Sequence, residues 1–212
     1  KRVLDETATS FGPEFALSRL ITQMNKPRYF ASQQRAQLFA RYKKAQVLWV
    51  QAEYFPIAGD ITQKAGAVLD AARKTWLRRH DKETGGIMGL FPLVQGMPVC
   101  FTQTLDKKRK IFKFTRGVVE GWTLDPVDEA RVKNAAEQEI MLTKMPLMIY
   151  IRKAGDDMLQ HMDLEPQVYG LASRGVEWHV DRAKENWVKR FGFPIVPDFA
   201  STVHAITGDQ LE

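Results

Sequence analysis

The sequence predicts a mixed α and β fold with a β-rich insert in its middle. Strand-like and helix-like segments alternate over residues 17–90, strand-like segments dominate residues 91–190, and a last strand begins near Phe193. Apolar residues make up 44% and charged residues 26% of the chain, which is typical of a folded globular protein. A chain of 212 residues can bury one good core, or one core with a small satellite domain.

The first three elements are predicted to be a strand, a helix and a strand. Residues 17–24 form an apolar run that Asn-Lys-Pro at 25–27 ends, so we expect a short strand and a turn. Proline suits the first turn of a helix, and residues 28–44 then carry apolar side chains at helical spacing. Residues 47–55 are rich in β-branched and aromatic side chains and precede a proline, which predicts the second strand.

A second helix and a basic hairpin follow. An apolar stripe over residues 61–77 predicts an amphipathic helix, for which Asp60 is the candidate N-cap. Residues 91–104 and 111–124 are β-prone and flank a basic run. This pattern predicts a hairpin whose tip lies at residues 106–110.

The second half of the chain continues with one helix and several short strands. Asp125-Pro126 ends the second hairpin strand. Residues 127–142 carry acidic side chains early and alanines through the middle, which predicts a helix. Residues 146–152, 167–171 and 176–180 predict further short strands.

The densest positive charge lies at the predicted hairpin tip. Residues 107–116 carry six cationic side chains and no acidic one, within a chain of net charge +6. Lys107, Lys108, Arg109 and Lys110 are therefore candidate contacts to nucleic-acid phosphates. The alternative is a solvated face, because a hairpin tip also needs charge to stay soluble.

Composition argues against several classes of protein. No apolar run approaches the roughly 20 residues that a membrane-spanning helix needs, so we expect no membrane partner. No histidine spacing typical of a metal site occurs, and a single cysteine, Cys100, favours an intracellular setting.

Strand alternation places Cys100 opposite Val99 and Phe101, and we expect a buried, unreactive thiol. Because the chain opens at Lys1 without a leader, we expect an internal piece of a longer protein.

The most informative segment lies at the end of the sequence. A β-prone run from Phe193 to Phe199 leads into small and hydroxylated side chains, and then into His204 and Gly208. Hydroxyl groups, an imidazole and glycine N–H groups can together hold a phosphate or an anionic backbone. Thr202, His204 and Gly208 are therefore candidate binding residues. The alternative is a plain strand-to-helix junction in which His204 satisfies a core hydrogen bond.

This segment resembles motif V of the Pif/RecD-like branch of superfamily-1 DNA helicases. The matching residues are Phe193-Pro194, Thr202, His204, Gly208 and Leu211. Two positions depart from the family pattern, since Ala205 stands where the family has lysine and Thr207 where it has glutamine. Both family residues are polar groups near DNA or nucleotide, so the resemblance in fold is stronger than the resemblance in activity.

Two earlier segments resemble the same family in the same order. Residues 91–102 and 114–122 resemble two strands of the small β-barrel that lies between motifs IV and V. Gly96 and Gly117 stand where such a barrel needs a bulge or a close backbone approach. Residues 20–29 resemble motif IV, a strand that runs into a helix. The order of the three matches carries the inference.

The resemblance implies the second motor domain of a Pif/RecD-like helicase. The implied fold class is α/β: a partial RecA-like P-loop helicase second domain with an inserted small β-barrel and helical segments. Residues 1–90 would hold the motif IV strand and helix with a helical insert. Residues 91–190 would form the β-rich insert, and residues 191–212 the return strand and motif V.

The resemblance also implies roles for individual residues and for partners. Thr202 and His204 would contact the backbone of single-stranded DNA, and Gly208 would lie near the γ-phosphate of ATP. The full-length parent would use ATP and Mg to move along DNA from 5′ to 3′, in the nucleus of a eukaryote or the cytoplasm of a bacterium. This piece alone would not hydrolyse ATP, because the first motor domain is missing and the phosphate loop Gly-x-x-x-x-Gly-Lys-Ser/Thr occurs nowhere in the sequence.

Two alternatives stay open. One is a degenerate or repurposed nucleic-acid-binding module, of transposon origin, that kept the barrel and lost the motor; Ala205 and Thr207 favour it. The other is a basic α/β domain that binds protein partners only. A phosphate loop before Lys1, or a Ser/Ala-Arg pair after Glu212, would discriminate in favour of the helicase.

Overall fold

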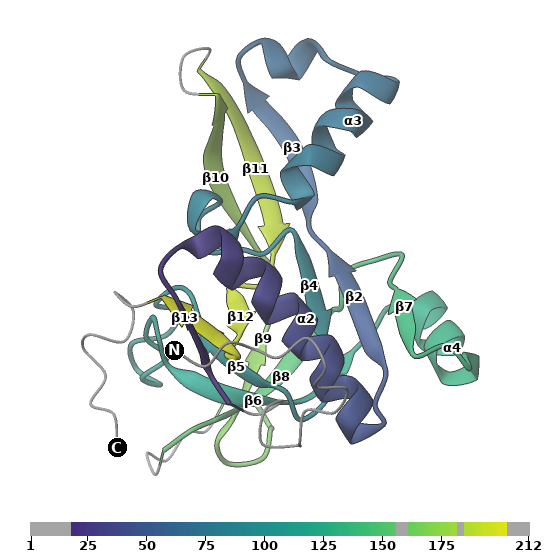
Figure 1. Cartoon of the computed structure of the whole chain (residues 1–212), viewed down its shortest axis with the longest axis vertical. Coiled ribbons are helices and arrows are strands. Elements are labelled where there is room, and N and C mark those ends of the chain that lie inside the picture. Colours follow the sequence, from purple (N-terminus) through teal and green to yellow (C-terminus); the bar gives the residue numbers. More distant parts are fainter. Residues whose placement is uncertain (1–17, 156–160, 182–184, 203–212) are drawn as a thin grey trace, which may run out of the picture.

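The described part of the chain, residues 18–155, 161–181 and 185–202 of a computed structural model, combines helices with four β-sheets (Figure 1). The mixed α/β class expected from the sequence is confirmed. The helical elements are α2 (Asn25–Lys43), α3 (Gly66–Leu77) and α4 (Pro126–Asn134), with the 3₁₀ turns η1 (Asp60–Gln63) and η2 (Asp81–Glu83). Within these described ranges, no helix is long and apolar enough to cross a membrane.

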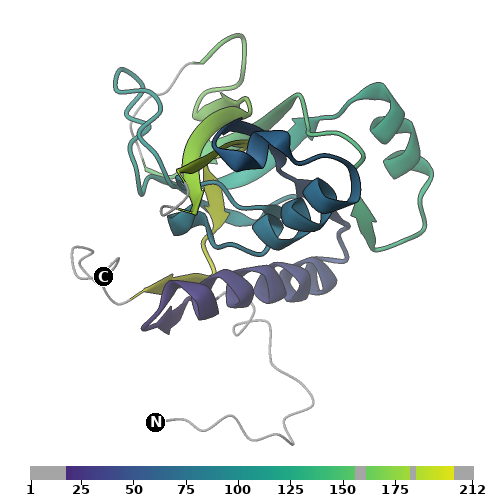
Figure 2. The same cartoon turned by 90° about the horizontal axis from the view of Figure 1, so that it is seen from above.

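A two-stranded parallel sheet joins the two ends of the described chain. Strand β1 (Leu20–Thr22) pairs with β13 (Ala200–Thr202). Helix α2 follows β1 and packs against both strands, as Figure 2 shows. Phe39 of α2 contacts Phe199 beside β13, with ring centroids 5.5 Å apart. The segments that resemble motifs IV and V are therefore neighbouring strands of one sheet.

Two further sheets form the β-rich body of the molecule, in the orders β12-β5-β6-β8-β9 and β4-β2-β7. Their strands are β2 (Val47–Gln51), β4 (Leu90–Leu93), β5 (Pro98–Phe101), β6 (Arg116–Thr123), β7 (Glu139–Met141), β8 (Met148–Lys153), β9 (Val168–Leu171) and β12 (Ile195–Pro197). One apolar cluster joins both sheets to α2 and includes the fully buried Leu48 and Phe101. A Cβ at Gly117 would lie 2.6 Å from the carbonyl oxygen of Arg152, so the close backbone approach expected at this glycine is confirmed.

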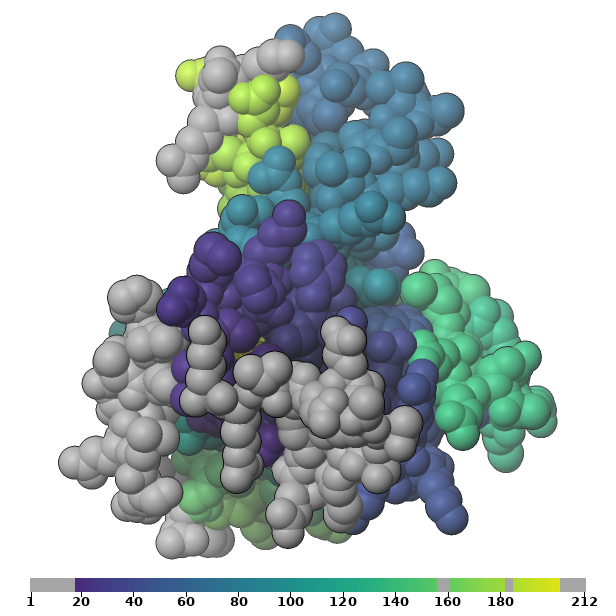
Figure 3. Space-filling model, viewed as in Figure 1, coloured from purple at the N-terminus to yellow at the C-terminus, as the bar shows by residue number. Residues whose placement is uncertain are grey.

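A lobe with its own small core projects from this body (Figure 3). It consists of α3 and a sheet in the order β10-β11-β3, with strands β3 (Glu53–Ala58), β10 (Arg174–Asp181) and β11 (Asn186–Gly192). Trp76 of α3 packs edge-on against Trp178 of β10, with centroids 6.3 Å apart. The fully buried Arg190 of β11 donates hydrogen bonds to the carbonyl oxygens of Trp76 and Ile87 and to Oγ1 of Thr84, at 2.5, 2.7 and 2.6 Å. Its guanidinium therefore ties β11 to α3 and to the connection after η2.

Four predicted elements differ from the structure. The strand predicted over 47–55 is two strands, since β2 and β3 belong to different sheets. The strand predicted over 91–104 is two strands, because β4 pairs with β2 while β5 forms the expected hairpin with β6. The helix predicted over 127–142 is too long; it ends at Asn134, because the following residues form β7 beside β2. Asp60 does not cap the second helix, since it begins a 3₁₀ turn and α3 begins only at Gly66.

Candidate nucleic-acid interface

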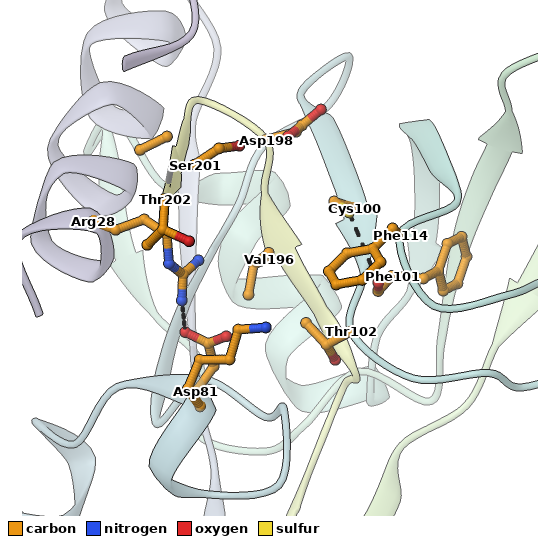
Figure 4. Close-up of a pocket in the computed structure, with 12 residues that line it drawn as sticks. Arg28, Asp81, Cys100, Phe101, Thr102, Phe114, Val196, Asp198, Ser201 and Thr202 are labelled. Atoms are coloured by element: carbon orange, nitrogen blue, oxygen red, sulfur yellow. Dashed lines mark hydrogen bonds and ion pairs between the residues drawn. The ribbon is translucent and has the colours of Figure 1, made fainter. Parts of the chain in front are cut away.

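A pocket opens where β13 ends, bordered by α2, the η2 turn and the loop between β5 and β6 (Figure 4). Arg28, Asp81, Ser201 and Thr202 lie at one end of it, Cys100, Phe101 and Phe114 lie at the other, and Val196 lies between them. The pocket therefore offers hydrogen-bonding groups at one end and aromatic surface at the other.

Arg28 in the first turn of α2 provides the main charge of the polar end. Its guanidinium forms an ion pair with Asp81 of η2, and these side chains are only 6% and 1% exposed. The Nε of Arg28 is also buried and makes no hydrogen bond with any residue that the structure describes. A buried donor without an acceptor is costly, so an anionic oxygen in the pocket would be stabilised at this position.

Asp198 forms ion pairs with two more arginines at the rim of the pocket. It forms an ion pair with Arg19, and Nε of Arg116 lies 3.3 Å from the same carboxylate. Burial lowers the pKa of Lys82, which also lines the pocket, while Asp81 opposes this shift. The pocket and its rim thus bring four cations together with two carboxylates, namely Arg19, Arg28, Lys82 and Arg116 with Asp81 and Asp198. This excess of positive charge favours an anionic ligand.

Thr202 is the sequence-predicted site residue that lies in the pocket. It ends β13, is 8% exposed, and lies beside the Arg28 guanidinium in Figure 4. Ser201 contributes a second hydroxyl from the same strand. The other two residues predicted at this end, His204 and Gly208, lie outside the described residues, as do Ala205 and Thr207.

The basic run 107–110 lies at the tip of the β5–β6 loop and does not line the pocket. The backbone N–H and Nη1 of Arg109 donate to the carboxylate of Asp106, at 3.0 and 2.7 Å. These hydrogen bonds, the backbone one first, hold the pKa of Asp106 below its ordinary value. The three lysines of the run are exposed. Arg109 is therefore engaged within the turn, and the lysines are the more accessible cations.

The base of the same loop carries an exposed aromatic ring between two lysines. Phe114 is 52% exposed, and the Nζ atoms of Lys82 and Lys113 lie 5.3 and 5.2 Å from its ring centroid. Its backbone φ is +74°, and its N–H donates to the carbonyl oxygen of Phe101 at 2.8 Å. Positive φ is uncommon for a bulky residue, so the neighbouring structure holds this ring in place.

Cys100 lines the pocket and is only partly buried, so the prediction of a buried thiol was wrong. Strand alternation holds as predicted, but Val99 and Phe101 are the fully buried pair and Cys100 is only partly buried on the opposite face. Alternation divides a strand into two faces without saying which one is covered.

Two histidines interact with neighbouring residues. Nδ1 of His161 accepts a hydrogen bond from the N–H of Gly170 at 3.0 Å, and its ring stacks on Tyr169. Nε2 of His80 lies 3.2 Å from the carboxylate of Glu83. Among residues 18–155, 161–181 and 185–202, no group of His, Cys, Asp or Glu side chains could hold a metal ion.

Arg28, Asp81 and Phe114 were not predicted as site residues from the sequence. Arg28 lies in the segment that resembles motif IV, and Phe114 lies among the cations of the basic run, so both carried a usable signal. Asp81 carried none, because only the fold brings η2 to the start of α2.

The fold is that of an α/β domain in which two neighbouring parallel strands enclose a β-rich insert. The Pif1 helicase from Candida albicans is similar, with a TM-score of 0.51 and 12% sequence identity over 95% of this chain and 39% of that one. Unliganded Pif1 from Bacteroides sp has a TM-score of 0.43 and 10% identity over 90% of this chain and 43% of that one. Bacteroides Pif1 bound to ssDNA has a TM-score of 0.44 and 10% identity over 90% and 32%.

The fold expected from the sequence is confirmed by the similarity to the Candida albicans structure. The chain spans about two fifths of the length of the first two of these structures. No protein-family model and none of the curated proteins matches the sequence.

Proposed function

We propose that this chain is the second-motor-domain segment of a Pif-like DNA helicase and binds the backbone of single-stranded DNA. The observation that carries the proposal is the end of β13, where Thr202 and the buried Arg28 line one pocket with excess positive charge. The fold shared with the Candida albicans helicase supports it. Contacts to phosphates hold a strand without reading its sequence, which suits a protein that moves along the strand.

In this proposal Thr202 and His204 donate hydrogen bonds to phosphates, and Gly208 approaches the γ-phosphate of ATP. The first motor domain of the parent chain supplies the phosphate loop, with Mg, across the nucleotide cleft. The parent acts in the nucleus of a eukaryote or the cytoplasm of a bacterium. The division into segments 1–90, 91–190 and 191–212 remains part of the same proposal.

The first test measures binding of a fluorescent single strand by anisotropy. Thr202→Val with His204→Ala should weaken binding by about one to two orders of magnitude, since each removes a hydrogen bond to a charged group. Thr75→Val, on the exposed face of α3, is the matched control and should leave the affinity unchanged. If the double variant binds the single strand as tightly as the unsubstituted chain does, Thr202 and His204 have a structural role and do not contact the DNA.

The basic run gives an independent test through the dependence on salt. Replacing Lys107, Lys108 and Lys110 by Ala should lower the slope of log affinity against log salt by about 0.7 for each phosphate that the variant no longer neutralises. Arg109→Ala is the control, because Arg109 is engaged with Asp106 and should change the slope least. If all variants have the same slope as the unsubstituted chain, the basic run faces solvent and does not contact phosphates.

ATP turnover separates the helicase from its rival, a degenerate binding module. The chain alone should show no turnover, because it has no phosphate loop. The full-length parent should hydrolyse ATP when single-stranded DNA is added. A parent that binds DNA but never hydrolyses ATP, in keeping with Ala205 and Thr207, would favour the degenerate module.

A further inference from the structure

The aromatic end of the pocket has no part in the backbone contacts proposed above. Phe114 projects from the base of the β5–β6 loop, and in Figure 4 it lies across Val196 from Arg28 and Thr202. More than half of its surface is exposed, although a phenyl ring is normally covered. An exposed ring at the mouth of a cationic pocket suits a ligand that is both flat and anionic.

The loop holds this ring by hydrogen bonds on both sides. The N–H of Phe114 donates to the carbonyl oxygen of Phe101, and the N–H of Lys113 donates to Oγ1 of Thr104 at 3.2 Å. On the other side, the N–H of Thr115 donates to the carbonyl oxygen of Phe112 at 3.1 Å. The backbone that carries the ring therefore does not have to be ordered on binding, which reduces the entropy cost of a stacking contact.

We propose that Phe114 stacks on one base of the bound single strand while the phosphate of that nucleotide enters the polar end of the pocket at Arg28 and Lys82. The assignment rests on the proposed single-strand function and adds a base-binding subsite to it. The unpaired Nε of Arg28 supplies a donor for one phosphate oxygen. Lys82 and Lys113, which border the ring, lie where phosphates adjoining the stacked base would pass.

Stacking accounts for the combination of groups better than capture of an acidic peptide does. A carboxylate side chain would use the cations and leave the ring exposed. A nucleotide uses both ends of the pocket, and every base has a face that can stack, so the contact tolerates any sequence.

The test compares two strands of equal length, one of thymidine and one of abasic deoxyribose phosphate, on the 212-residue chain. Phe114→Leu should weaken thymidine binding by about five- to a hundredfold, the usual range for one stacked base, and leave abasic binding unchanged. Phe114→Tyr should restore it. Phe112→Leu is the matched control, since Phe112 is 45% exposed in the same loop. Lys82→Ala should weaken both strands and lower the salt slope by about 0.7.

The outcomes are separable from the fate of the proposed function. If Phe114→Leu weakens both strands equally, or leaves both unchanged while the Thr202 variant weakens them, single-strand binding stands and the base subsite is overturned. If the unsubstituted 212-residue chain binds neither DNA strand but binds an acidic peptide, both proposals are wrong. Circular dichroism and urea unfolding of each variant exclude loss of fold as the cause.

Discussion

Arg28 at the start of α2 and Asp81 in η2 form an ion pair that is almost fully buried, although they are far apart in sequence. Removing one member of a buried pair leaves an uncompensated charge. We expect Asp81→Ala to lower the free energy of unfolding by about 3–5 kcal/mol in urea denaturation. The double variant Arg28→Met, Asp81→Leu should recover much of that stability, because neither charge remains. A single variant as stable as the parent would show that water reaches the pair.

The strand β11 shows why part of the fold could not be predicted. Its buried side chains include Asn186, Val188 and Arg190, whereas Trp187 and Phe191 are only partly buried. A period-2 pattern predicts a strand only when the covered face is apolar, and here a polar side chain alternates inward. Arg190 is tolerated inside because its Nη1 and Nη2 atoms donate to three acceptors. The strands with apolar inner faces, such as β8, were predicted to within about two residues.

The site was predictable only where one segment carries several of its residues. Thr202 was found because it follows a β-prone run and belongs to a linear pattern. The partners of Thr202 in the pocket come from α2, η2 and the β5–β6 loop, and only the parallel pairing of β1 with β13 assembles them. The basic run was conspicuous in the sequence but lies outside the pocket. The density of charge along a sequence does not indicate where in the fold those charges lie.

Arg190 is expected to be the least replaceable polar residue of the lobe. Arg190→Met would remove its three hydrogen bonds, to Trp76, Ile87 and Thr84. Since a hydrogen bond to a charged group is worth about 1.5–3 kcal/mol, the free energy of unfolding should fall by at least about 3 kcal/mol. Arg190→Lys should rescue only part of this, since an ammonium lacks the planar fork. Full stability of the methionine variant in urea would contradict this account.

Asp128 should make the stability of the β-rich body depend on pH. Burial alone would raise the pKa of this carboxyl, but hydrogen bonds from the N–H groups of Lys144 and Thr143 and from the Thr143 hydroxyl outweigh it and lower the pKa below its ordinary 3.8. A lowered folded-state pKa stabilises the fold above the unfolded pKa, and the effect is lost as pH falls through the folded pKa.

The corresponding variant is Asp128→Asn, measured by urea unfolding at a series of pH values. At neutral pH it should be less stable than the parent by about 1.5–3 kcal/mol, the usual value of a hydrogen bond to a charged group. The difference should shrink below about pH 4, as Asp128 becomes protonated in the parent. Asp70→Asn is the control, because its pair with Arg73 is exposed and worth less than about 1 kcal/mol. If the difference in free energy of unfolding does not change with pH, the ionised carboxylate of Asp128 is not its cause.

The rate at which a thiol reagent labels Cys100 shows whether bound single-stranded DNA covers the pocket. It is the single cysteine, is partly buried, and lines the pocket with Phe114, so a small thiol reagent should label the native chain more slowly than the denatured chain but at a measurable rate. Saturating single-stranded DNA should slow the labelling in proportion to the fraction bound, since nucleotides in the pocket would cover the sulfur. Cys100→Ser, which should take up no label, gives the background. If saturating strand leaves the labelling rate of the native chain unchanged while anisotropy reports full binding, the DNA passes elsewhere on the surface, and the pocket at the end of β13 is not its track.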